Sequence, residues 1–441
     1  MNKRLTGWLI AIGLLVFTCA GAQEKKLISL NEAIDLGLKN SKQLKNSQAK
    51  IEEATASLKE ANQKRLPDAS VSASYLRLNS ANIDLKTKTN NGGSGNPNTT
   101  PKVSQAAYGI LNASLPLYAG SRIKYGIEAS RYLEQAAMLD AENDREEVIQ
   151  NTIEAYINLY KAKASANLVK ENLATSNQRV TDLTNLEKNG LLPRNDLLKA
   201  QLQSSTIELS LLDAENNWQL ANVSMDILLG LPEKTELIPD STTIDQPIHA
   251  KTLDEYVQAA YTNRKDASAL NLRKKAAETG IKAVKGEYYP SLSLTGGYIA
   301  ADIPKLLTVT NAVNLGLGVS YNIGSIWKTK AKVQQAEAKA KQLSISESIL
   351  ADNIRLEVSR SYLNWLSSQK KIQVYAKAIE QADENYRIVK NKFNNSLATT
   401  TELLDADMAL LQAKLNFVFA KADAVVAYNK LLQNSGLETK Q

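Results

Sequence analysis

The chain has 441 residues, 43% apolar, 22% charged and only 6% aromatic, so it is neither a disordered polar chain nor a bundle of apolar membrane helices. One Cys and one His leave little for thiol chemistry, a zinc cluster or a His-based triad, and no phosphate loop or dinucleotide signature is visible. We therefore expect no enzyme activity, metal site or cofactor. The net charge of +7 is spread among acids without a basic arm, so nucleic-acid binding is not expected.

The first 22 residues are predicted to be a signal peptide. Two basic residues precede an apolar run over residues 8–17, and Ala20 to Ala22 supply the small residues that a signal peptidase requires. In the alternative interpretation Cys19 becomes a lipidated N-terminus, although Thr18 before it is larger than usual. Either route exports the chain. Beyond residue 22 no stretch is apolar enough for a spanning helix, so membrane entry would require strands.

The rest of the chain contains two copies of one unit. Leu30 aligns with Leu253 at an offset of 223 residues, and Tyr156 aligns with Tyr362 at an offset of 206. The first copy therefore carries 17 more residues than the second. The predicted organisation is a signal peptide (1–22), a first repeat (23–230), a linker (231–252), a second repeat (253–436) and a short tail (437–441).

Each copy contains two stretches in which apolar and small polar residues alternate. They predict strands at about 68–78, 106–118, 291–300 and 311–323. Such strands, of about 10 residues with one apolar face, are typical of outer-membrane barrels. A soluble two-sheet sandwich is the alternative. The hairpins lie far apart in the chain, and no second sheet is predicted to cover their apolar face, which argues against the sandwich.

The remaining segments predict long helices. Between Ile345 and Phe393 there is neither Pro nor Gly, and apolar residues recur every seven positions from Val358 to Phe393. In the first copy, the 68 residues from Ser121 to Lys188 would span about 100 Å as one helix. That length exceeds what a compact domain uses.

With these features in this order, the mature chain resembles the TolC-like outer-membrane efflux protein family. The resemblance depends on the tandem halves, on a Pro before the first strand of each half and on the turns at Asn189-Gly190 and Asn395-Ser396. It implies a mainly α fold with a small β part, in which long coiled-coil helices and β-hairpins repeat in tandem. It also implies a homotrimer in the outer membrane of a Gram-negative cell, with a 12-stranded β-barrel continued by an α-helical periplasmic barrel.

The four predicted strands of one chain cannot close a barrel, because the smallest membrane barrels need about eight. Several chains must therefore pool their strands. Sequence alone also permits a dimer with eight strands. The resemblance implies that the trimer is the exit duct of a tripartite efflux or type I secretion system. Its implied partners are outer-membrane lipid, a periplasmic adaptor and an inner-membrane pump of the RND or ABC type.

The resemblance also places two functional regions at the helical turns. The tips where the adaptor would dock comprise Asn189, Gly190, Leu191, Leu192, Asn395, Ser396, Leu397 and Ala398. Glu402 and Asp405 match an acidic pair that lines the periplasmic aperture in family members, where a ring of carboxylates would favour cations. In the alternative interpretation these acids only complement the helix dipole, with Thr399 or Thr400 as the cap.

The chain departs from the family pattern at two tip positions. Some members close the tip with a Tyr and an Arg, and the aligned residues here are Phe393 and Ala398, which cannot make those bonds. Arg387, Lys390 and Lys392 are candidates for a different closure. The competing functional interpretations are a non-conducting periplasmic or surface coiled-coil rod and an exported enzyme, for which no convergent polar cluster is found.

Overall fold

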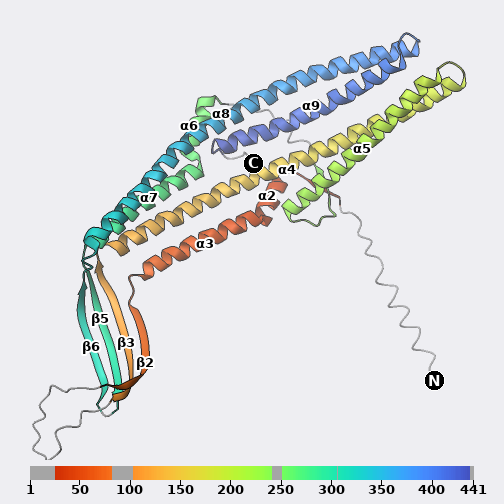
Figure 1. Ribbon diagram of the computed structural model, residues 1–441. Coiled ribbons are helices and arrows are strands. Elements are labelled where there is room, and N and C mark those ends of the chain that lie inside the picture. Colours follow the sequence, from red (N-terminus) through yellow and green to blue (C-terminus); the bar gives the residue numbers. More distant parts are fainter. Residues whose placement is uncertain (1–24, 82–102, 241–250, 305, 438–441) are drawn as a thin grey trace, which may run out of the picture. The chain divides into compact units, whose positions relative to one another are not determined.

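The computed structural model describes residues 25–81, 103–240, 251–304 and 306–437. The predicted signal peptide and Cys19 lie outside these residues. The chain divides into two compact units (Figure 1). The sheet unit comprises Ala49–Leu139 and Ser268–Ser348, and the helical unit comprises the rest of the described chain. None of the helices in the described ranges has an apolar stretch long enough to cross a membrane.

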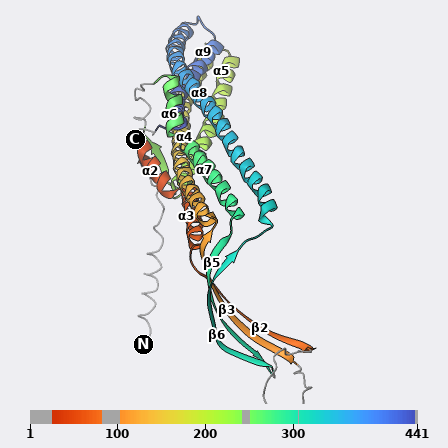
Figure 2. The ribbon, with the colours of Figure 1, turned by 90° about the vertical axis from the view of Figure 1, so that its left-hand side faces the viewer.

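The sheet unit contains one antiparallel sheet of four strands, drawn as long neighbouring arrows in Figure 2. In spatial order the strands are β2 (Asp68–Ala81), β3 (Val103–Ala119), β5 (Ser291–Ile303) and β6 (Leu307–Ser320). The two hairpins, predicted separately, thus join through β3 and β5.

The register gives this sheet one apolar and one polar face. Val71 pairs with Leu111, Leu111 with Tyr298 and Tyr298 with Val313, so apolar side chains form a row across all four strands. One position along, the corresponding row is Ser70, Asn112, Gly297 and Asn314. Val71 and Val313 are almost fully exposed, which leaves the apolar face uncovered in the single chain.

Long helices follow and precede these strands. Their bounds are α3 (Lys42–Gln63), α4 (Arg122–Lys188), α5 (Arg194–Leu229), α7 (Lys265–Lys285), α8 (Ser325–Asn394) and α9 (Thr400–Asn434). The 67-residue α4 and 70-residue α8 are continuous, as the absence of Pro in both segments allows. The predicted long helices are therefore confirmed.

The helical unit also holds a small parallel sheet that the sequence patterns did not predict. Strand β1 (Lys25–Ile28) pairs with β4 (Glu236–Pro239), which lies in the segment predicted to be a linker. The hydroxyl of Tyr156 fixes this pair, because it accepts the backbone N–H of Asp240 at 2.8 Å and lies 3.0 Å from the Ile28 carbonyl oxygen. Burial raises the pKa of this tyrosine to about 12, so it stays a neutral donor.

The core beside Tyr156 joins the first helical hairpin to the short helix α2 (Leu30–Asn40). A second core forms where helix α6 (Leu253–Asn263) packs against α8 and α9 through Tyr256, Val358 and Leu431. A third, smaller cluster around Leu183, Leu197 and Ala200 lies near the turn of the first hairpin.

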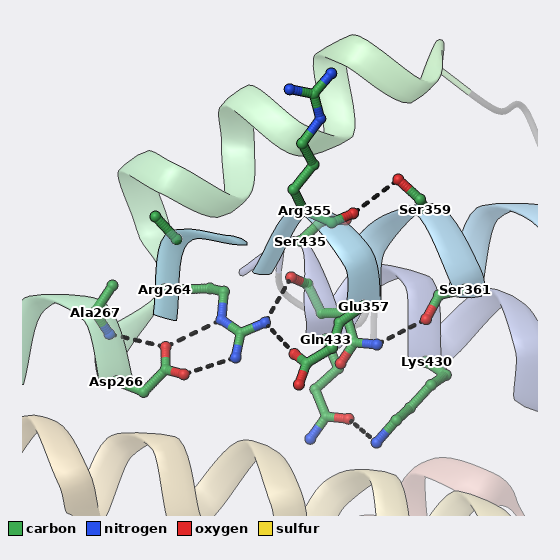
Figure 3. Close-up of polar contacts among 12 residues, drawn as sticks. Arg264, Asp266, Ala267, Arg355, Glu357, Ser359, Ser361, Lys430, Gln433 and Ser435 are labelled. Carbon is green, nitrogen blue, oxygen red and sulfur yellow. Dashed lines mark hydrogen bonds and ion pairs between the residues drawn. The ribbon is translucent and has the colours of Figure 1, made fainter. Parts of the chain in front are cut away.

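Arg264, at the α6–α7 junction beside the second cluster, contacts both α8 and α9 (Figure 3). The Arg264 guanidinium forms a bidentate pair with Asp266, at 2.6 and 3.0 Å, and a 2.7 Å ion pair with Glu357 of α8. It also donates to the Asn434 carbonyl, the last residue of α9, at 3.4 Å. Bidentate pairing of this kind holds a guanidinium in one orientation.

Candidate functional site

Both helical hairpins end in the same backbone turn. Gly190 follows α4 and Ser396 follows α8, with left-handed φ values of 72° and 61°. The next residue in each case, Leu191 or Leu397, donates its N–H to the carbonyl five residues earlier, at 2.9 and 2.8 Å. These bonds satisfy carbonyls at the helix end, as in a Schellman motif. Figure 1 shows both turns at the same end of the helical unit.

Side chains reinforce the equivalence of the two turns. Asn189 and Asn395 each donate a side-chain amide to the carbonyl four residues earlier, both at 2.7 Å. Leu191 is 73% exposed and Leu397 is 76% exposed. Each tip thus presents one apolar side chain to the surroundings on a fixed turn. The other residues of the predicted docking tips are exposed except Leu192 and Ala398, which are half-buried.

The helices that leave the turns begin differently. Thr399 caps α9 in a capping box: its hydroxyl accepts the Glu402 N–H, and the Glu402 carboxylate accepts the Thr399 N–H at 2.7 Å. Pro193 precedes α5 and offers no side-chain cap. Of the two caps considered, Thr399 is the one in the structure, and Glu402 returns a hydrogen bond to it.

Capping does not remove the negative charge of Glu402. Hydrogen bonds from the backbone N–H and hydroxyl of Thr399 hold the pKa of Glu402 below its usual range, so the carboxylate is ionised at neutral pH. Glu402 and Asp405 are both exposed and lie three residues apart on α9. In the first hairpin, Asp196 instead pairs with Lys199 at 3.3 Å, and Lys199 also donates to Thr401.

A buried arginine joins the two hairpins behind the tips. Arg179 of α4 donates to Asp407 of α9 at 3.0 Å and to the Tyr386 hydroxyl of α8 at 3.1 Å. Arg179 is only 8% exposed and Asp407 only 5%. Sequence reasoning missed this triad, because Arg179 and Asp407 adjoin the apolar seam and nothing in a single sequence shows that they face each other. The one sequence signal for such a triad is a charged residue that adjoins the apolar positions of a helix.

The predicted closure candidates make other contacts. Arg387 pairs with Glu384 of its own helix through two 2.7 Å bonds, and Lys390 lies over the ring of Tyr386, also on α8. Phe393 packs against the apolar cluster of the first tip, which contains Leu183 and Leu197. In the described chain, an apolar contact and the Arg179 triad therefore connect the hairpins.

Comparisons with known proteins agree with this architecture. A family model described as "Outer membrane efflux protein" matches residues 33–231 and 256–437. The chain belongs to this outer membrane efflux protein family. The predicted resemblance, the mainly α fold with a small β part and the outer-membrane location are thereby confirmed.

Individual members of the family are distant in sequence. The outer membrane efflux protein BepC of Brucella suis biovar 1 (strain 1330) is 23% identical over 350 residues, covering 77% of this chain and 75% of BepC. The Campylobacter jejuni CmeC outer membrane channel superimposes with a TM-score of 0.75 at 19% identity, covering 92% of this chain and 85% of CmeC. The outer membrane protein VceC of Vibrio cholerae superimposes with a TM-score of 0.74 at 18% identity, covering 92% of this chain and 96% of VceC.

The family model thus identifies this chain as an outer membrane efflux protein.

Proposed function

We propose that three copies of this efflux protein form a passive duct through the outer membrane. The observation that carries the proposal is the open four-stranded sheet. In the described chain its edge strands β2 and β6 each pair on one side only, and its apolar face is exposed. Unpaired strand edges cannot stay in lipid, and four strands are too few to close. Three copies supply twelve strands, and their polar faces then line a lumen.

The helical unit supports the same assembly. Helix α5 carries exposed apolar residues at coiled-coil spacing: Leu198, Leu202, Leu209, Leu220 and Ile227. Helix α8 carries a similar exposed series: Leu356, Leu363, Val374 and Ile388. The packed interior lies instead around α9, which contacts both α4 and α5. In the proposed trimer, α5 of one copy packs against α8 of the next.

The acidic pair would form the narrowest part of this duct. Threefold symmetry brings three copies of Glu402 and Asp405 together, and such rings favour cations. The support is the exposure of both carboxylates and the lowered pKa of Glu402. The role in capping and the role in the aperture are compatible, because the capping box uses hydrogen bonds and leaves the net charge in place.

The two tips would dock a periplasmic adaptor that connects the duct to an inner-membrane pump of the RND or ABC type. Leu191 and Leu397 support this role, since exposed apolar side chains on rigid turns are suited to bury in a partner. In this proposal the chain has no enzymatic activity, and the pump supplies the energy.

Conductance in a planar lipid bilayer tests the duct. Purified mature protein is expected to give discrete ion-conducting steps. A protein that never conducts would instead support the non-conducting coiled-coil rod. The control variant carries Leu315→Asp and Leu317→Asp on the apolar sheet face, and it is expected to lose insertion because charged side chains in the bilayer are costly.

A further inference from the structure

All four strand–helix junctions of the sheet unit lie at one end of the sheet. Ser291, the first residue of β5, pairs with both Ala119, the last of β3, and Ser320, the last of β6. Asp68, the first residue of β2, pairs with Ser114 near the end of β3. The residues just outside these strand ends therefore share one edge of the sheet, opposite the edge where the hairpins turn.

Basic side chains without a carboxylate partner gather at this end. Arg65 lies three residues before β2, Arg122 and Lys124 open α4, and Lys328 and Lys330 lie in the first turns of α8. All five are exposed, and in the described ranges none forms an ion pair. Asp68, also exposed, offsets one of these charges.

Two other acids near this end are engaged with other lysines. Glu287 pairs with Lys332 at 2.7 Å, and Glu337 pairs with Lys285 at 3.2 Å. Arg122 donates through Nε to the Ala119 carbonyl at 3.1 Å, and Lys124 lies over the ring of Tyr125, but neither contact removes the charge. The five basic residues therefore present a positive surface at this end of the sheet.

Exposed aromatic residues lie at the same end. Tyr118, Tyr289, Tyr321 and Trp327 are each largely exposed. Tyr118 pairs across the strands with Leu292, and Leu292 pairs with Val319, so Tyr118 continues the apolar face of the sheet. The other three aromatic residues lie just beyond the ends of β5 and β6. Amphipathic aromatic rings with basic side chains beside them are characteristic of the level of lipid headgroups. We call these nine residues the junction collar.

We propose that the junction collar binds the headgroups of anionic phospholipids in the periplasmic leaflet of the outer membrane. The proposal rests on the proposed insertion of the sheet into the bilayer. When the aromatic rings of the collar lie at the headgroup level, the neighbouring lysines and arginines lie against lipid phosphates. A guanidinium group such as that of Arg122 binds phosphate through two parallel hydrogen bonds. Basic residues arranged along a sheet end beside an apolar face suit a lipid surface, whereas a soluble phosphate needs converging donors.

Lipid retention in nanodiscs tests the proposal. Wild-type protein is reconstituted in equal amounts of phosphatidylglycerol and phosphatidylethanolamine, and lipids retained after re-extraction are measured by mass spectrometry. The wild type is expected to retain phosphatidylglycerol with several-fold enrichment. The collar variant replaces Arg65, Arg122, Lys124, Lys328 and Lys330 with Gln and is expected to retain the two lipids about equally.

A matched variant controls for net charge. It replaces five exposed lysines elsewhere on α8 with Gln, namely Lys339, Lys341, Lys370, Lys371 and Lys377, and it is expected to keep the enrichment. Bilayer conductance of each variant shows that it folds and inserts. If the collar variant still retains phosphatidylglycerol preferentially, the lipid-binding proposal is wrong. A wild type that inserts without preferring either lipid would also refute this proposal, and both results would leave the proposed duct intact. A wild type that never enters bilayers contradicts the proposed duct as well.

Discussion

The two helical hairpins have the same backbone conformation at their turns and differ in the charges beside them. Gly190 and Ser396 adopt the same left-handed turn, and an exposed leucine follows each. The first hairpin neutralises Asp196 with Lys199, whereas the second keeps Glu402 ionised beside Asp405. The geometry of the turn is thus common to both repeats, while an acid paired with a neighbouring lysine is found in the first and an exposed acidic pair in the second. Variants that affect one hairpin and spare the other test this division.

The largest effect is expected where the hairpins are joined. Arg179→Met leaves Asp407 buried without its cationic partner and with only the Asn172 amide donating to it at 3.4 Å. The loss is expected to cost about 3–5 kcal/mol of unfolding free energy. Thermal unfolding measures this loss. The double variant Arg179→Met/Asp407→Leu removes both charges and should recover most of the stability. A single variant as stable as the wild type would show that the triad does not hold the hairpins together.

The two exposed leucines should act together in export. Leu191→Asp combined with Leu397→Asp places charges where the adaptor is proposed to bury apolar surface, so efflux in cells should fall by roughly tenfold or more. Conductance of the purified protein should stay unchanged, because neither side chain packs in the core. Each single variant then measures whether the tips contribute equally. Unimpaired efflux in the double variant would exclude the docking role.

The acidic pair gives an electrical difference between the hairpins. Glu402→Gln with Asp405→Asn should shift the reversal potential of the channel toward that of a non-selective pore. Asp196→Asn, the control in the first hairpin, should leave it almost unchanged because Lys199 already neutralises Asp196. Since the folded-state pKa of Glu402 is lowered, wild-type selectivity should persist through neutral pH and weaken only below about pH 4.5. Equal reversal potentials in all three proteins would refute the aperture.

A buried acid distinguishes the bases of the hairpins. Asp226 of α5 aligns with Leu432 of α9, and its carboxylate oxygen Oδ1 has no partner. Burial raises the pKa of Asp226 from 3.8 to about 6. The folded state therefore binds more protons between these values, so stability falls as pH rises from about 4 to about 6. Asp226→Asn should raise unfolding free energy on the order of 1–2 kcal/mol at pH 7 and hardly at all at pH 4. A gain of equal size at both pH values would contradict this explanation.

The smallest effect concerns the helix caps. Thr399→Ala removes the capping box of α9 and should cost about 1 kcal/mol, measured by denaturant unfolding at neutral pH. The lowered pKa of Glu402 means that this contribution is present at neutral pH and is lost as pH falls through the folded-state pKa. Pro193→Ala, at the equivalent place in the first hairpin, removes no side-chain cap and should cost less. Equal losses of unfolding free energy in the two variants would show that the capping box does not stabilise α9.

The sequence predicted the long helices and the four strands because their periodicity extends over many residues. Strand β4 escaped prediction because four residues carry too little alternation to be recognised. The Arg179–Asp407 pair also escaped, since 228 residues separate its members and only packing shows that they meet. At the tips, the family resemblance placed Leu191 and Leu397 in the docking region and the sequence offered Thr399 or Thr400 as the cap of α9. The hydrogen bond from the Thr399 N–H to Glu402 required the structure.

The assembly itself is tested most directly by the native mass of the protein extracted in mild detergent. We predict a particle of three copies, because twelve strands close the sheet edges that β2 and β6 leave open. A particle of two copies would favour an eight-stranded pore. A single copy that remains soluble without detergent would contradict the duct altogether.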